Sequence, residues 1–162
     1  MAPPKMTDGT TPIEYEGQLV TIPGKELGRA SFDKIPNGVP GIEDRMPILW
    51  TYGVGQGRLS LNRLVELCCT NPAKIFGLYP HKGTLAVGAD ADVVIWDPQA
   101  VKTMGVGASH QRTDYNLYEG WETRGVPRQV FLRGNLLVDG ETWNGEPGGG
   151  QWLKRAAHAP LL

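Results

Sequence analysis

The stretch TNPAKIFGLYPHKGTLAVGADADVVIWDP, residues Thr70–Pro98, changes character halfway along its length. Its first part predicts a short helix: Asn71 is a good N-cap, Pro72 suits the first helical position, and Gly77 is a typical helix end. The second part has the composition of turns and strands. A helical region therefore gives way to a β region near Tyr79–Gly83.

The β region is predicted from two apolar patterns. Leu85 and Val87 are spaced two residues apart, which is the period of a strand. The run Val93–Trp96 is β-branched and aromatic, and the turn-forming pair Asp97-Pro98 follows it. We expect strands at both places, the second ending at Asp97-Pro98.

A second helix is predicted just before this stretch. Ser60 is a plausible N-cap, and four apolar residues follow at the spacing of one buried helical face: Leu61, Leu64, Val65 and Cys68. The only two cysteines, Cys68 and Cys69, are adjacent, so they cannot link distant segments by a disulfide. We expect both of them to be buried.

Residues 1–47 contain Pro or Gly every few positions and show no sustained period of 2 or 3.6 residues. Disordered segments are usually rich in charge and poor in apolar residues, whereas this one keeps apolar side chains from Ile13 to Ile42. We therefore predict an ordered, packed loop.

The C-terminal third predicts a hairpin and a tail. The apolar runs Val130–Leu132 and Leu136–Val138 are separated by Arg133, Gly134 and Asn135, and the last two of these tolerate positive φ. The final residues, GEPGGGQWLKRAAHAPLL, are rich in glycine and then basic, which is typical of an arm or tail.

Composition excludes several classes of function. The net charge is −1 and the pI is about 6.3, so no basic surface for nucleic acid or an anionic membrane is expected. No apolar run is long enough to span a bilayer, and MAPPKMTDG lacks the apolar core of a signal peptide. His81, His110 and His158 form no cluster at metal-ligand spacing. We expect a cytoplasmic protein that binds neither nucleic acid nor a membrane.

The predicted elements do not make a complete domain. Three or four strands, one clear helix and a long loop would leave the sheet edges open, and natural proteins normally cover such edges. The chain is therefore expected either to be the C-terminal part of a longer enzyme or to pair with other chains.

Four stretches carry a family resemblance: FDKIPNGVPGIEDRMP (32–47), GVGQGRLSLNRLVELCCTNPAKIFGLYPHKGTLAVGADADVVIWDP (53–98), DYNLYEGWETRGVPRQVFLRG (114–134) and GQWLKRA (150–156). In kind and order they resemble the C-terminal third of the dihydropyrimidinase and hydantoinase branch of the amidohydrolase superfamily. The resemblance implies an α/β fold, in which the C-terminal end of a (β/α)8 barrel is followed by the C-terminal half of a composite β-sandwich.

The same resemblance implies a domain organisation. Residues 1–80 would be the last portion of the barrel, residues 81–142 the C-terminal share of the sandwich, and residues 143–162 a C-terminal arm. Full-length members are commonly tetramers or dimers, and the arm commonly reaches a neighbouring subunit.

The resemblance also implies chemistry. Such enzymes hydrolyse a cyclic amide (a hydantoin, dihydropyrimidine or related ureide) to an N-carbamoyl amino acid, with hydroxide held by two divalent metal ions, generally zinc. Their ligands are a His-x-His pair, a carboxylated lysine, two further histidines and an aspartate. This sequence contains no His-x-His. We expect the chain alone to bind no metal and to be inactive.

Asp8, in TDGTTP, is the one position that matches a ligand of the family. The resemblance implies that Asp8 binds metal and shuttles protons, although Gly9 stands where histidine is often found. A solvated turn aspartate is the alternative.

Asn37, in IPNG, is expected from the resemblance to present its main-chain groups to the cyclic amide of the substrate.

Glu43, Asp44 and Arg45 are interpreted as a structural ion-pair and capping set, because adjacent carboxylates without a metal or base are usually solvated or paired with arginine.

Two other hypotheses stay open beside the enzyme. The chain could belong to a non-enzymatic, dihydropyrimidinase-related scaffold that keeps the fold and assembles without metal. It could also be a remnant with no independent function, and such a remnant should not unfold cooperatively.

Overall fold

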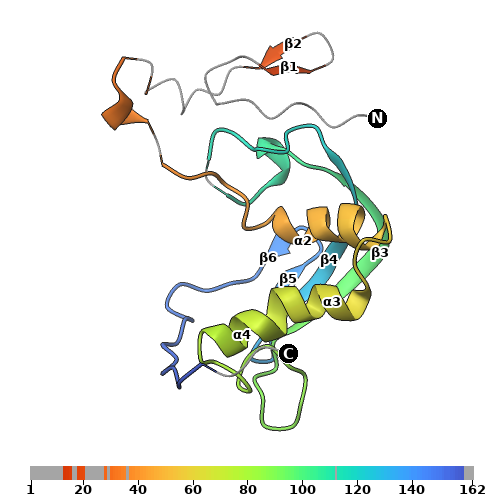
Figure 1. Cartoon of the computed structure of the whole chain (residues 1–162), viewed down its shortest axis with the longest axis vertical. Coiled ribbons are helices and arrows are strands. Elements are labelled where there is room, and N and C mark those ends of the chain that lie inside the picture. Colours follow the sequence, from red (N-terminus) through yellow and green to blue (C-terminus); the bar gives the residue numbers. More distant parts are fainter. Residues whose placement is uncertain are drawn as a thin grey trace. The chain divides into compact units, whose positions relative to one another are not determined.

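The computed structural model describes residues 13–15, 18–20, 28, 30–35, 37–111 and 113–158 (Figure 1). The chain divides into two compact units, Met1–Ile48 with Val101–Arg124 and Leu49–Ala100 with Gly125–Leu162. In the first unit, β1 (Ile13–Tyr15) pairs antiparallel with β2 (Gln18–Val20). The prediction of an ordered, packed loop over residues 1–47 was wrong for these two segments, which are strands, and for Phe32 and Ile42, which are 85% and 87% exposed.

Short helical elements occur in both units. The first unit contains the 3-10 helix η1 (Phe32–Lys34), α2 (Arg45–Ile48) and the 3-10 helix η4 (Val106–Ala108). The second unit begins with the π-helical segment η2 (Leu49–Val54). In the described part of the chain, no helix has both the length and the apolar character needed to cross a membrane.

The second unit contains a continuous helical run, which Figure 1 shows in yellow-green. It consists of α3 (Leu61–Val65), the π-helical turn η3 (Glu66–Thr70) and α4 (Asn71–Ile75). Ser60 caps the run as predicted, because its hydroxyl accepts a hydrogen bond from the backbone N–H of Arg63 at 3.1 Å.

Asn71 lies inside this run rather than at its start, so its predicted role as an N-cap was wrong. Its φ and ψ are −65° and −44°, and its backbone N–H donates to the carbonyl of Glu66, five residues before it. A proline inside a helix removes one N–H and crowds the carbonyl of the preceding turn. The wide π turn directly before Pro72 gives that carbonyl more room.

Gly77 ends the helix, as predicted, and also contacts the C-terminal segment. Its φ is 67°, and its N–H donates to the carbonyl of Lys74 at 3.2 Å. The N–H of Ala156 donates to the carbonyl of Gly77 at 2.8 Å, and a Cβ on residue 77 would collide with the carbonyl oxygen of Ala156. The C-terminal segment is therefore held against the end of α4 in its own chain.

The segment between α4 and the sheet consists of turns, so the strand predicted from Leu85 and Val87 was wrong. These side chains are 73% and 108% exposed. The ammonium of Lys82 lies 2.7 Å from a carboxylate oxygen of Asp90 and 2.5 Å from one of Asp92. These ion pairs hold the two ends of the segment 82–92 together. Leu85 and Val87 lie between them and do not pack against a sheet.

A four-stranded sheet follows, with the strand order β3-β4-β5-β6. The strands are β3 (Val93–Thr103), β4 (Glu122–Leu132), β5 (Asn135–Asp139) and β6 (Thr142–Trp143). The pairs β4/β5 and β5/β6 are antiparallel, and Figure 1 shows β4 and β5 side by side in blue. The predicted α/β content is thus present, with an antiparallel sheet.

The strand predicted at Val93–Trp96 is present but does not end at Asp97-Pro98. It continues to Thr103, so the predicted boundary was wrong. Because β3 is an edge strand, the missing N–H of Pro98 can be tolerated there. The carboxylate of Asp97 accepts the N–H groups of Gln99 at 2.9 Å and Ala100 at 3.1 Å, which satisfies the backbone just after the proline.

The predicted hairpin is confirmed, with a shorter turn than expected. Leu132 pairs with Asn135, so the turn is Arg133-Gly134, with φ values of 49° and 79°. Asn135 is already in β5, and its predicted place in the turn was wrong. Two consecutive positive φ values are typical of a type I′ turn. The N–H of Arg133 donates to the carboxylate of Asp92 at 3.0 Å, which supports this unusual position for arginine.

Few apolar side chains are buried in the described part of the chain: Leu64, Ala73 and Met104 are 2%, 5% and 4% exposed. The helical face predicted to be buried was wrong at Leu61 and Val65, which are 51% and 52% exposed. Both cysteines are free, and neither is buried as predicted: Cys68 is half-buried and Cys69 is exposed. Other exposed large apolar side chains include Phe32, Ile42, Leu85, Val87, Val94, Ile95, Trp143 and Trp152.

Candidate functional site

Asn37 lies in an exposed turn of the first compact unit, shortly after η1. Gly38 follows with a φ of 72°, in the left-handed region that favours glycine. Both residues are exposed, which leaves the backbone at this turn accessible to a small molecule. The accessible backbone suits the main-chain role predicted for Asn37.

Two side chains of the segment 109–116 hold the backbone that follows Asn37. The hydroxyl of Tyr115 donates to the carbonyl oxygen of Gly38 at 3.2 Å. The N–H of Gly41 donates to Oε1 of Gln111 at 3.1 Å. The turn is therefore fixed at two points, three residues apart, by one segment that is distant in sequence.

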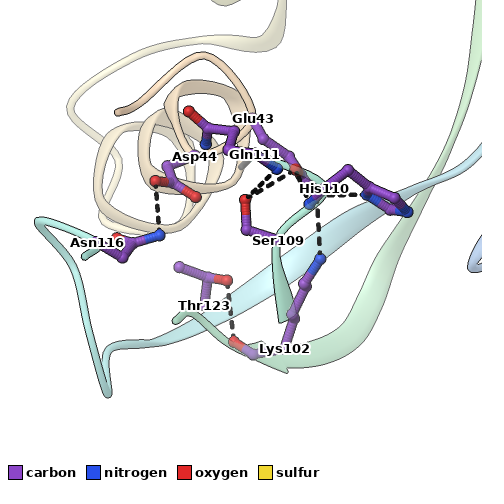
Figure 2. Close-up of polar contacts among 8 residues, drawn as sticks. All are labelled: Glu43, Asp44, Lys102, Ser109, His110, Gln111, Asn116 and Thr123. Atoms are coloured by element: carbon purple, nitrogen blue, oxygen red, sulfur yellow. Dashed lines mark hydrogen bonds and ion pairs between the residues drawn. The ribbon is translucent and has the colours of Figure 1, made fainter. Parts of the chain in front are cut away.

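Glu43 forms hydrogen bonds and ion pairs with residues of this segment and of β3 (Figure 2). Its Oε2 accepts the hydroxyl of Ser109 at 3.1 Å and the backbone N–H of His110 at 2.8 Å. Its Oε1 lies 3.1 Å from Nδ1 of His110 and 3.5 Å from Nζ of Lys102. Burial alone would raise the pKa of Glu43, but the hydrogen bonds from His110, the charge of Lys102 and the Ser109 hydroxyl together lower it from 4.5. Glu43 is an ionised anchor at neutral pH.

Asp44 anchors the far end of the same segment. It is 4% exposed and accepts a hydrogen bond from Nδ2 of Asn116 at 3.0 Å; Asn116 is also 4% exposed. Burial raises the pKa of Asp44 and the charge of Glu43 adds to this, while the bond from Asn116 opposes both. Glu43 and Asp44 thus make structural contacts, with partners from a distant part of the chain.

The described residues do not fit a metal centre. Asp8, the predicted ligand, lies outside the described residues. Within residues 13–15, 18–20, 28, 30–35, 37–111 and 113–158, no three His, Cys, Asp or Glu side chains are grouped so that they could hold a metal ion. A catalytic zinc needs at least three protein ligands, and His110 is instead bound to Glu43.

The residues that support the turn were not predicted from the sequence. Gln111, Tyr115 and Asn116 lie 70, 77 and 72 positions from their partners, and a single sequence carries no signal that pairs residues so far apart. The only local signal was the density of polar side chains in SHQRTDYN, residues 109–116.

Residues 34–137 match the model of the amidohydrolase family, which is well over half of the 162-residue chain. The chain belongs to the amidohydrolase family. The branch inferred from its sequence motifs is also confirmed, because its amidohydrolase relatives include D-hydantoinases and a dihydropyrimidinase.

Two relatives and one solved structure show how far the similarity extends. The D-hydantoinase of Geobacillus stearothermophilus is 49% identical over 150 residues, which cover 93% of this chain and 31% of the relative. The dihydropyrimidinase of Rattus norvegicus is 39% identical over 100% of this chain and 34% of the relative. The structure of a D-hydantoinase from a Bacillus sp. AR9 superposes with a TM-score of 0.80 at 48% identity, over 85% of this chain and 30% of that chain. The amidohydrolase chain described here thus spans about a third of its relatives' length.

Proposed function

We propose that this chain is the C-terminal part of a hydrolase that opens cyclic amides, of the D-hydantoinase and dihydropyrimidinase type. The observation that carries the proposal is the 49% identity to a D-hydantoinase over 93% of the chain. Hydrolysis adds water across the ring amide, breaks its C–N bond and yields an N-carbamoyl amino acid. The substrate would be a hydantoin, a dihydropyrimidine or a related ureide.

In this proposal residues 1–80 complete a (β/α)8 barrel, residues 81–142 supply part of a β-sandwich, and residues 143–162 form an arm. The exposed apolar side chains support an incomplete structure. Leu61 and Val65 lie on a helix with apolar periodicity and yet are about half exposed. Burying a large apolar side chain stabilises a protein by about 1.5–3 kcal/mol, so we expect the rest of the enzyme to cover them.

Within the proposed enzyme, Asn37 binds the cyclic amide through its main chain. The support is the exposed turn with Gly38 at positive φ and the two hydrogen bonds that hold the turn. Asp8 would be the one metal ligand that this chain contributes. Because the described residues form no metal site, the other ligands would come from the remainder of the enzyme.

We also propose that the full-length enzyme is a homo-oligomer, a tetramer or dimer. Trp152, in the proposed arm, is 84% exposed and offers an apolar surface to a neighbouring subunit.

A hybrid enzyme tests the proposed activity. In it, this chain replaces the matching segment of the Geobacillus stearothermophilus D-hydantoinase, which supplies the other two thirds. We expect the purified hybrid to release N-carbamoylglycine from hydantoin, and the donor enzyme without the segment to be inactive. A hybrid that folds and assembles like the donor enzyme but does not open hydantoin would contradict the proposal and favour the scaffold hypothesis.

A further inference from the structure

The turn that carries Asn37 contains two glycines, which add flexibility, and one buried proline, Pro40, which limits it. Residues 37–41 read Asn-Gly-Val-Pro-Gly, with Gly38 in the left-handed region. A Cβ at Gly38 or Gly41 would meet nothing within 4 Å, so no neighbouring side chain packs against the Cβ position of either residue. Glycine loses more conformational freedom on ordering than any other residue. A binding group needs a position fixed to within about 0.5 Å, so contacts from outside the turn that reduce the freedom of its glycines matter for binding.

Two side-chain hydrogen bonds restrain the turn from outside, in addition to the backbone bond from the N–H of Arg45 to the carbonyl of Gly41. The Tyr115 hydroxyl holds the carbonyl of Gly38, in the peptide directly after the one that joins Asn37 to Gly38. Oε1 of Gln111 holds the N–H of Gly41 at the other end. The bonds restrain both ends of the flexible stretch, and neither involves the side chain of Asn37.

The backbone that carries Gln111 and Tyr115 is tied to Glu43 and Asp44 through neighbouring residues. The N–H of Gln111 donates to the hydroxyl of Ser109 at 3.1 Å, and that hydroxyl donates to Glu43. Asn116, next to Tyr115 in the sequence, donates to the buried Asp44, and Figure 2 shows this bond. These hydrogen bonds therefore lead back to residues 37–44, the same short segment that contains the turn.

We propose that Tyr115 and Gln111 are positioning residues for Asn37, which hold its main-chain groups in the geometry that binds a cyclic amide. This inference rests on the proposed function, because it explains how the site given there to Asn37 is kept in place. Asn37 would bind the ring amide, which all the candidate substrates share, so the effect of removing either positioning side chain should not depend on the substituent of the ring.

Single-group variants of the hybrid enzyme test the inference. Tyr115→Phe removes only the hydroxyl, and Gln111→Met removes the acceptor while keeping a side chain of similar length. Tyr118→Phe is the matched control, because it makes the same change on a tyrosine whose ring packs against Trp121 at 5.2 Å. Two readouts are measured: kcat and KM for hydantoin and dihydrouracil, and amide hydrogen exchange of the peptide that contains residues 37–41.

We expect each positioning variant to lower kcat/KM by about 10-fold for both substrates, because small misplacements of a binding group are costly. In both variants, amide exchange at Gly38, Val39 and Gly41 should accelerate. Their melting temperatures should stay within about 2 °C of the parent hybrid, because the lost bonds are few. The control Tyr118→Phe should change neither the kinetics nor the exchange.

Unchanged exchange or unchanged kcat/KM in Tyr115→Phe and Gln111→Met would overturn the inference. An inactive parent hybrid would instead count against the proposed function. In that case the exchange measurement still decides whether the two side chains order the turn.

Discussion

The indole rings of Trp50 and Trp96 lie 5.3 Å apart at an angle of 44°, and Gly125 of β4 lies against both of them. The pair joins η2 to β3 within the second compact unit. The φ of Gly125 is 91°, and a Cβ there would lie 2.6 Å from Nε1 of Trp50 and 2.8 Å from Nε1 of Trp96. The aromatic pair can approach the strand only because residue 125 has no side chain.

Gly125→Ala should therefore destabilise the hybrid enzyme, by about 2–4 kcal/mol, because it combines overpacking with an unfavourable positive φ. The apparent melting temperature measures the effect. Gly107→Ala is the control: a Cβ at that position meets nothing within 4 Å, and we expect a change of less than about 0.5 kcal/mol. Equal melting temperatures for the Gly125 and Gly107 variants would show that the tryptophan pair does not pack against β4.

Asn37 should tolerate loss of its side chain but not loss of its N–H. In the hybrid enzyme, Asn37→Ala should keep kcat/KM within about 3-fold, whereas Asn37→Pro should lower it by about 100-fold or more, the usual effect of removing one preorganised donor. Steady-state kinetics on hydantoin provide the measurement. A 100-fold loss in Asn37→Ala would assign the binding role to the side chain instead.

The isolated chain should have no hydantoinase or dihydropyrimidinase activity, even with added zinc or manganese. The described residues supply no cluster of metal ligands, and Asp8 alone could not hold a catalytic metal. Release of an N-carbamoyl product above a metal-only blank would refute this prediction. The search for a site would then restart at Asp8, His81, His110 and Cys68.

Glu43 should contribute stability that depends on pH in a defined direction. Its pKa is lower in the folded protein than the ordinary 4.5, so the folded state favours the ionised form. The contribution is therefore complete above pH 4.5 and is lost as the pH falls through the lower, folded value. Melting curves of the hybrid and its Glu43→Gln variant should differ at pH 7 and converge below that window. A difference that grows as the pH falls would have the wrong sign.

Local signals predicted the parts of the fold that depend on neighbouring residues. Ser60 and Gly77 were correctly placed at helix ends, because a cap acts within about one turn. The hairpin at Arg133-Gly134 was found for the same reason. Other predictions were wrong because they depend on contacts beyond the neighbouring residues. The ion pairs of Lys82 turn the chain where Leu85 and Val87 suggested a strand, and the edge position of β3 lets it continue through Pro98.

The candidate site likewise combines a local sequence motif with contacts between residues far apart in the sequence. The role of Asn37 stays a prediction, which the family resemblance could suggest because the motif IPNG is contiguous in the sequence. Its contacts to the rest of the molecule were not predictable. The Tyr115 hydroxyl reaches Gly38 across 77 positions, and no periodicity or turn signal encodes such a pairing.

The contact between Gly77 and Ala156 offers a way to study assembly without truncation. A single methyl group at residue 77 would occupy the place of the Ala156 carbonyl oxygen. Gly77→Ala should therefore detach the C-terminal segment from α4 while leaving its sequence complete. A deletion removes both the side chains of this segment and its position against α4. Sedimentation of the Gly77→Ala hybrid would show whether subunit association depends on the side chains alone or also on that position.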